Sequence, residues 1–235
     1  MRKGTKVALW VVGAVVIIFA IIFVWRTVYF YNQIKKGGVG TVPGGAAHFT
    51  ASKSASSANW PANNKIDLVG VDSPRLGNPS AKITIVEFAD FTCPFSKQEF
   101  PVVRELLAKY PNKINFVYRY FPLGDVNHAG GKEAAISAVC ANSQGKFWPF
   151  HDKLFQNQKN FTKADLLALA GQSGLDMELL GPCLESAAVK SKVEKDWADG
   201  AALGVGGTPT FFINGEKVEG AIPLEAWENA LGLVK

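Results

Sequence analysis

Cysteine and histidine are scarce in this chain of 235 residues, which contains three of each. Three cysteines are too few for a small protein held together mainly by disulfides. The three histidines, His48, His128 and His151, lie far apart and lack the spacing of metal ligands. The sequence therefore predicts neither a metal site nor a bound cofactor.

Acidic residues are absent before Asp67, although basic residues are frequent there. The first 36 residues contain six basic residues, namely Arg2, Lys3, Lys6, Arg26, Lys35 and Lys36. Without these six, 19 Lys and Arg residues stand against 20 Asp and Glu residues, a net charge of −1. The basic character thus belongs to the N-terminal segment, and the rest of the chain predicts no nucleic-acid partner.

A long uncharged run occupies residues 7–25 and reads VALWVVGAVVIIFAIIFVW. As a helix these nineteen residues would span roughly 28 Å, close to the thickness of the hydrocarbon core of a bilayer. The run is longer than the apolar part of a signal peptide, and Arg26 and bulky aromatic residues follow it instead of a small-residue cleavage site. We expect residues 1–36 to form an uncleaved membrane anchor with basic flanks, in contact with lipid through residues 7–25.

Residues 37–64 lack apolar periodicity, and Gly, Ala and Ser make up 15 of these 28 residues. Such a composition is typical of a flexible tether. As a random coil it would span about 30 Å, which would let an attached domain reach partners near the membrane. The ordered domain is therefore expected to comprise residues 65–235.

A strand, a turn and a helix open this domain. Residues 83–88 form a short β-branched, apolar run, typical of a strand buried on both faces. Residues 96–110 carry apolar side chains at helical spacing, and we expect Pro101 to kink that helix. Residues 113–120 alternate like a second strand, so the three segments predict a β-α-β unit with a partly parallel sheet.

Helical patterns then continue from Lys132 to Leu203, interrupted by glycines and by Gly181-Pro182. The β pattern returns at residues 210–214 and 217–219, with a hairpin turn at Asn214-Gly215. A last helix is expected through Leu231. The predicted order is β-α-β, a helical block, and β-β-α.

Cys93 lies where the first strand passes into the helix, within Cys93-Pro94-Phe95-Ser96. The N-terminal end of a helix has free N–H donors and a partial positive charge, both of which stabilise a thiolate. Cys93 is therefore a candidate nucleophile. A buried and inert cysteine at a helix start is the competing interpretation.

Two motifs in this order resemble the DsbA-like thiol–disulfide oxidoreductases of the thioredoxin superfamily. Residues 86–95, VEFADFTCPF, are similar to their strand and active-site turn, and residues 207–215, GTPTFFING, are similar to their loop with a cis-proline and the following strand. The resemblance covers nearly all of residues 66–235. It implies an α/β, thioredoxin-like fold with an inserted helical domain at about residues 124–203, here preceded by a single transmembrane helix.

The resemblance also implies roles for individual residues. Pro209 would follow a cis peptide bond and face Cys93, with the Thr208 backbone free to pair with an extended substrate segment. Pro94 and Phe95 would help to position the substrate beside the thiol. Glu87 resembles the buried acid beneath the family's active site, which relays protons; a solvated Glu at a sheet edge is the competing interpretation.

Ser96 departs from the family's Cys-x-x-Cys motif because it occupies the position of the second, resolving cysteine. No disulfide can form within the motif, and a serine cannot resolve a mixed disulfide. A monothiol mechanism, in which an external thiol resolves the intermediate, and covalent retention of clients are both open. An engineered trapping substitution or a loss of catalysis would equally account for the serine.

Cys140 and Cys183 both lie in the segment that resembles the inserted domain. Three cysteines allow three single pairings, and two free thiols are also possible. The resemblance favours a Cys140–Cys183 disulfide, because Cys93 belongs to the other lobe and some family members contain such a pair.

Structural disulfides persist mainly outside the cytosol. Basic residues flank the apolar run on both sides, so their positions do not decide its orientation. The expected disulfide does: it favours an N-terminus in the cytoplasm and a domain outside.

The sequence therefore predicts a single-pass cell-membrane protein whose extracytoplasmic domain is a disulfide oxidoreductase or isomerase that uses Cys93. Its expected partners are cysteine-containing secreted or membrane proteins and a redox partner, either a membrane oxidase or reductase or a low-molecular-weight thiol. A second hypothesis is a non-redox, chaperone-like module that binds clients beside Pro209. A third is a glutathione-conjugating or isomerising enzyme, because related kappa-class transferases and hydroxychromene isomerases use a serine, although theirs is at the first motif position.

Overall fold

A central sheet organises the domain in the computed structural model, which describes residues 67–70, 72–159 and 161–234. Its strands have the spatial order β1-β3-β2-β4-β5. They are β1 (Arg75–Gly77), β2 (Ile83–Ala89), β3 (Ile114–Tyr120), β4 (Thr210–Ile213) and β5 (Glu216–Glu219). Only the β2–β3 pair is parallel, whereas the β1–β3, β2–β4 and β4–β5 pairs are antiparallel. The mixed sheet follows from one β-α-β crossover and one terminal hairpin.

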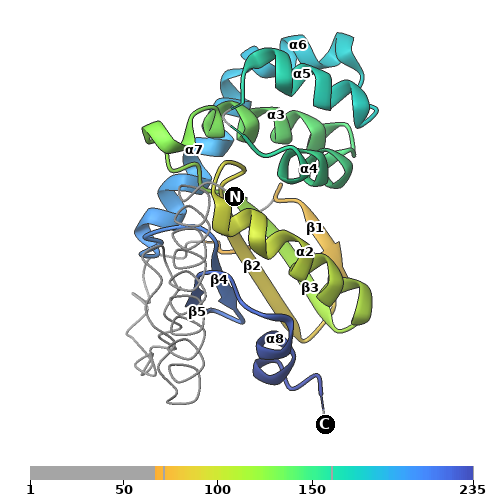
Figure 1. The fold of residues 1–235 in the computed structure, drawn as a ribbon, viewed down its shortest axis with the longest axis vertical. Coiled ribbons are helices and arrows are strands. Elements are labelled where there is room, and N and C mark those ends of the chain that lie inside the picture. Colours follow the sequence, from red (N-terminus) through yellow and green to blue (C-terminus); the bar gives the residue numbers. More distant parts are fainter. Residues whose placement is uncertain (1–66, 71, 160, 235) are drawn as a thin grey trace, which may run out of the picture. The chain divides into compact units, whose positions relative to one another are not determined.

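Helix α2 (Pro94–Lys109) connects β2 to β3 and lies across one face of the sheet, together with α8 (Leu224–Ala230) (Figure 1). The helix begins two residues earlier than its apolar pattern indicates, and it continues through Pro101 to Lys109. Alternate side chains of the strands fill the layer beneath it, since successive side chains of a strand point to opposite faces. The buried members of this cluster are Ile85, Val103, Leu106, Leu107, Ile114, Phe116, Phe211, Ile222 and Trp227.

A helical block separates β3 from the terminal hairpin. It contains a 3-10 turn (Val126–His128), α3 (Gly131–Ser143), α4 (Phe147–Gln156), α5 (Lys163–Gln172), α6 (Met177–Glu185) and α7 (Ala187–Ala202). Figure 1 shows α3, α4, α5 and α6 grouped beyond the end of the sheet at which α2 begins. A disulfide joins Cys140 of α3 to Cys183 of α6, with an S–S distance of 2.06 Å.

Two glycines allow backbone conformations or contacts that other residues would not. In the terminal hairpin, Asn214 (φ 49°) and Gly215 (φ 96°) both have positive φ, the geometry of the tight turn that the Asn-Gly pair predicts. In α7, a Cβ atom at Gly200 would lie 2.7 Å from Phe121 Cδ2 and 2.9 Å from Phe88 Cδ1. Gly200 therefore sets how closely α7 approaches the sheet.

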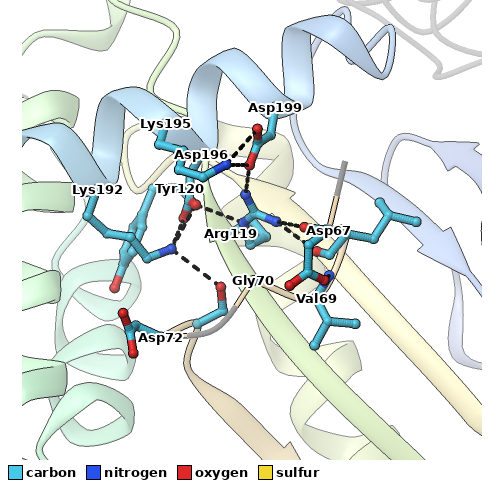
Figure 2. A network of polar contacts seen from close by, with 12 residues as sticks. Asp67, Val69, Gly70, Asp72, Arg119, Tyr120, Lys192, Lys195, Asp196 and Asp199 are labelled. Atoms are coloured by element: carbon cyan, nitrogen blue, oxygen red, sulfur yellow. Dashed lines mark hydrogen bonds and ion pairs between the residues drawn. The ribbon is translucent and has the colours of Figure 1, made fainter. Parts of the chain in front are cut away.

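Arg119 of β3 is the centre of a buried network of charges (Figure 2). Its guanidinium donates to Asp196 Oδ1 at 2.8 Å and to Asp199 Oδ2 at 2.5 Å, both on α7. Its remaining nitrogen donates to the backbone carbonyls of Asp67 (2.9 Å) and Leu68 (2.8 Å). Because a planar guanidinium can make all these bonds at once, one side chain links β3, α7 and the first described residues of the domain.

The predicted membrane anchor (residues 7–25) and tether (residues 37–64) lie outside the described residues. Among the helices that are described, none is long and apolar enough to cross a bilayer.

Candidate active site

Cys93 occupies the N-cap position of α2, directly after the turn that leaves β2. The Cys93 N–H donates to the carbonyl of Asp90 at 3.1 Å. The Asp90 carboxylate accepts the Thr92 N–H (2.8 Å), the Thr92 hydroxyl (2.7 Å) and the Leu123 N–H (2.8 Å). Asp90 thus fixes the turn from within, and the free N–H groups of the helix start lie next to the thiol.

The thiol of Cys93 contacts the cis-proline loop. The Thr208–Pro209 peptide bond is cis, and Cys93 Sγ lies 3.1 Å from the Thr208 carbonyl oxygen. Cys93 is a free thiol, only 3% exposed, so its S–H donates to that carbonyl. The motifs at residues 86–95 and 207–215 therefore meet at Cys93, and the Thr208 carbonyl is engaged by the thiol before any substrate arrives.

The residues after Cys93 divide between solvent and core. Pro94 forms the first position of α2, where its missing N–H costs no helical bond. Phe95 is 44% exposed, whereas Ser96 is fully buried and its hydroxyl has no hydrogen-bond partner among the described residues. Phe91, which precedes the motif, is buried against Tyr118 and Phe155, so of the two aromatic residues that flank Cys93 in the sequence, Phe95 is the exposed one.

Glu87 lies on β2 beneath α2 and is buried, so the competing interpretation of a solvated edge position is wrong. It stands in register with Tyr118 of β3 and Phe211 of β4. Burial raises the pKa of Glu87 well above its ordinary value, and the charge of Glu99 raises that pKa further. Burial thus favours the protonated form of Glu87.

Glu99 is a second buried acid that the sequence pattern did not reveal. Its carboxylate accepts the Ile222 N–H and the Trp227 indole N–H, each at 2.6 Å. Burial raises the pKa of Glu99 to about 7, and these two hydrogen bonds oppose the rise. The available signal was its position three residues after Ser96 and four before Val103, on the buried side of α2.

Tyr118 completes the polar set beneath the turn. Its ring stacks on Phe91 with centroids 5.4 Å apart, and its buried hydroxyl has no partner among the described residues. Burial raises the pKa of Tyr118 well above its ordinary value, and negative charge at Glu87, Asp90 and Cys93 adds to the effect. Burial thus favours the protonated form of Tyr118 near Cys93, and the hydrogen bond that the thiol makes within the described residues is the one to the Thr208 carbonyl.

His151 borders this site through Phe91 and Tyr118, whereas His128 lies at the 3-10 turn. His151 is buried among aromatic rings, with Nδ1 2.9 Å from Asp152 Oδ1, and burial lowers its pKa. His128 Nδ1 lies 2.7 Å from Asp125 Oδ1 at the 3-10 turn. In the part of the chain that the structure describes, no group of three or more His, Cys, Asp or Glu side chains is arranged to hold a metal ion.

The sequence matches the family described as Thioredoxin over residues 70–232. Among curated proteins, the chain is 41% identical over 171 residues to Na(+)/H(+) antiporter NhaA 1 of Salinispora arenicola, a match that covers 71% of this chain and 26% of the antiporter. It is 34% identical over 145 residues to Na(+)/H(+) antiporter NhaA of Herminiimonas arsenicoxydans, covering 62% and 23%. The chain spans about a quarter of the length of these relatives.

Solved structures share the fold. A thioredoxin-like oxidoreductase from Silicibacter pomeroyi is 30% identical, with a TM-score of 0.66, covering 73% of this chain and 97% of that one. A periplasmic thioredoxin-like protein from Salmonella enterica serovar Typhimurium is 25% identical, with a TM-score of 0.60, covering 69% and 89%. The thiol–disulfide exchange protein α-DsbA2 of Wolbachia pipientis is 22% identical, with a TM-score of 0.64, covering 72% and 91%.

Proposed function

Because the chain belongs to the thioredoxin family, we propose that it carries out thiol–disulfide exchange through Cys93, as the DsbA-like members of that superfamily do. The family match and the structural neighbours confirm the predicted resemblance and the thioredoxin-like α/β fold. The contact between Cys93 Sγ and the Thr208 carbonyl, beside cis-Pro209, is the observation that carries the proposal. It places a free thiol at a helix N-terminus next to a backbone segment that can pair with a client.

The exchange step conserves electrons overall. The Cys93 thiolate attacks one sulfur of a client disulfide, so a Cys93–client S–S bond forms and the client S–S bond breaks. The leaving client sulfur departs as a thiolate and takes up a proton. Burial favours the protonated form of Glu87, and we assign this residue the role of proton relay between the buried thiol and solvent.

Ser96 determines how the mixed disulfide between Cys93 and the client is resolved. It has no thiol, so the Cys93–client bond persists until an external thiol, such as glutathione or a client cysteine, attacks it. That attack releases the Cys93 thiolate and forms a new disulfide between the other two sulfurs. We therefore propose a monothiol exchange or isomerase activity, in which Cys93 never forms a disulfide within its own motif.

We also propose that the domain acts outside the cytoplasm and is attached to the cell membrane by residues 7–25. The Cys140–Cys183 disulfide supports an oxidising compartment, and the Salmonella neighbour at 25% identity is described as periplasmic. Its clients would be cysteine-containing secreted or membrane proteins.

Trapping of mixed disulfides tests the proposed function. The full chain, incubated with a protein that contains an exposed disulfide, should accumulate a covalent adduct that dithiothreitol releases, and Cys93→Ala should abolish it. Ser96→Cys should form a disulfide between Cys93 and the introduced thiol and oxidise reduced model proteins, because the two sulfurs would lie one helical turn apart. Ser173→Cys, which adds a thiol at another buried serine at the end of α5, should not.

Two results would contradict the proposal. Absence of any Cys93 adduct at neutral pH would remove the nucleophile. A Ser96→Cys variant that forms its motif disulfide yet exchanges with no thiol substrate would favour the non-redox binding module instead, because Ser96 would then not be the obstacle to cycling.

A further inference from the structure

Gln158 connects the helical block to the active-site turn. It lies in the segment between α4 and α5, 65 residues along the chain from Cys93. Its side-chain nitrogen donates to the carbonyl of Phe91 at 3.0 Å and to the carbonyl of Cys93 at 2.8 Å. Both partners are acceptors only, so the amide nitrogen, not its oxygen, must face the turn.

The bond to the Cys93 carbonyl has a specific importance because Pro94 follows. The Cys93–Pro94 peptide unit has no N–H, so neighbouring groups can hold it only through its carbonyl oxygen. That oxygen accepts the Lys97 N–H at 3.1 Å, the first backbone bond of α2, and the Gln158 amide. Gln158 therefore supplies one of two bonds that fix the peptide unit carrying the nucleophile.

Asp90 and Gln158 hold the same turn from opposite sides. Asp90 accepts the N–H of Thr92 through its side chain and the N–H of Cys93 through its backbone carbonyl. Gln158 donates to the two carbonyls on either side of Thr92. Asp90 thus accepts hydrogen bonds from the N–H groups of the turn, and Gln158 donates hydrogen bonds to its carbonyls. In this arrangement Cys93 Sγ is directed at the Thr208 carbonyl.

The amide also affects charge. A carbonyl oxygen carries partial negative charge, so the Phe91 and Cys93 carbonyls of the turn disfavour a thiolate at Cys93. A donor hydrogen-bonded to both offsets that negative charge without adding a net charge, and it acts as a fixed dipole that needs no rearrangement when the thiolate forms.

We propose that Gln158 is a positioning residue for the reaction of Cys93: by clamping the Phe91 and Cys93 carbonyls, it orients the thiol toward the cis-proline loop and favours the thiolate. The proposal rests on the proposed function, because it assigns Gln158 a part in that exchange. It makes the segment after α4 a component of the active site, although no sequence motif marks it.

The test measures the rate of Cys93 alkylation by iodoacetamide in the full chain between about pH 5 and pH 9, the range in which thiols ionise. Gln158→Leu keeps a similar volume and removes both donors. It should lower the rate about threefold to tenfold near pH 6 and change the rate much less near pH 9, where the alkaline solution favours the thiolate with or without the amide. A purely structural role would not produce this dependence on pH.

The charged and titratable groups around the turn stay the same in this variant. They are Asp90 in the turn, Glu87 on β2, Tyr118 on β3 and His151 on α4, and the nearest basic residues in the sequence are Lys97 on α2 and Lys159, which pairs with Asp165. Since neither glutamine nor leucine titrates, a shifted pH profile reports the lost hydrogen bonds.

Gln144→Leu is the matched control. Gln144 also joins two segments through its amide, accepting the Asp176 N–H at 2.7 Å and donating to the Asp176 carbonyl at 3.1 Å, but it does so within the helical block. This variant should destabilise the block and leave the alkylation profile of Cys93 unchanged. An equal shift in both variants, or no shift in Gln158→Leu, would overturn the proposal.

Gln158→Asn is the second test variant, to be used if the leucine variant folds poorly. The shorter side chain cannot reach both carbonyls, so a smaller shift in the same direction is expected, and an unchanged profile would count against the proposal. The outcome is separable from that of the proposed function. Alkylation needs no client, so Gln158 can pass this test even if the chain exchanges with no disulfide.

Discussion

Two buried carboxyl groups under one helix are the most unusual feature at the scale of single residues. Glu87 and Glu99 lie in the otherwise apolar layer between α2 and the sheet, and each is held there without an ion pair among the described residues. Removing a carboxylate from water is costly, so such groups bind protons instead. Their burial therefore links the stability of the domain to pH.

The sign of that link follows from the raised pKa of Glu99. The folded protein holds the Glu99 proton up to about pH 7, whereas the unfolded chain releases it near the ordinary pKa of 4.5. Between these values the folded state binds more protons, so the free energy of unfolding falls as pH rises. The shift corresponds to a loss of about 3 kcal/mol across this interval, and the raised pKa of Glu87 acts in the same direction.

We predict that Glu99→Gln flattens this dependence. Urea unfolding at pH 5 and pH 8 should show the wild-type protein losing about 2.5 kcal/mol more than the variant on going to the higher pH. Relative to the wild-type protein, the variant should be about 1 kcal/mol less stable at pH 5, because its amide nitrogen cannot accept one of the two N–H groups of Ile222 and Trp227, and about 1.5 kcal/mol more stable at pH 8. Glu105→Gln, on the exposed side of the same helix, should behave like the wild type.

At the scale of elements, local pattern predicted most of the domain. The buried strands β2 and β3 are apolar and β-branched, and the Asn214-Gly215 turn has the residues that its positive φ angles require. β1 escaped prediction because its three residues, Arg-Leu-Gly, are exposed or half-buried and form no apolar run. These three residues form a strand because they pair with β3, and not because of an apolar pattern of their own.

The active site was predictable only where its residues belong to a motif. Cys93 and Pro209 lie in recognisable segments, and the structure brings them together through one contact with Thr208. Glu99 and Gln158 lie in no motif, because their partners are 123 and 65 residues away in the sequence. Contacts of that kind depend on how α8 and the segment after α4 pack, which local patterns do not specify.

The close contact of α7 with the sheet gives a prediction for this scale. Gly200→Ala would place a methyl group 2.7 Å from the ring of Phe121, so the helix or the ring must move. We expect a loss of about 1–3 kcal/mol in the free energy of unfolding, even though alanine favours helices. Gly181→Ala in α6 is the control: its Cβ would meet nothing within 4 Å, so the substitution should be neutral or stabilising by up to about 1 kcal/mol. Equal effects of both substitutions would contradict this account of α7.

At the scale of the whole molecule, the sequence predicts a domain carried on a tether. The charge of the first 36 residues and the apolar run of residues 7–25 separate that segment from the nearly neutral remainder. We predict that deletion of residues 1–36 moves the protein from the membrane fraction to the soluble fraction, measured after a carbonate wash. Deletion of residues 37–64 alone, which keeps the apolar run, should leave the protein in the membrane fraction. Release of the intact full-length chain by carbonate would exclude a spanning anchor.

The Arg119 network has a mechanical consequence for a tethered domain. Arg119 donates hydrogen bonds to the carbonyls of Asp67 and Leu68, the first described residues. It also pairs with the carboxylates of Asp196 and Asp199. Tension on the chain from its N-terminal side would therefore be borne by this cluster of bonds between β3 and α7. Cys93 lies at the start of α2, whereas Arg119 packs over Phe88 in the cluster on the other face of the sheet. In the proposed tethered protein, a pull from the membrane side would thus act first on β3 and α7, and not on the helix that carries the thiol.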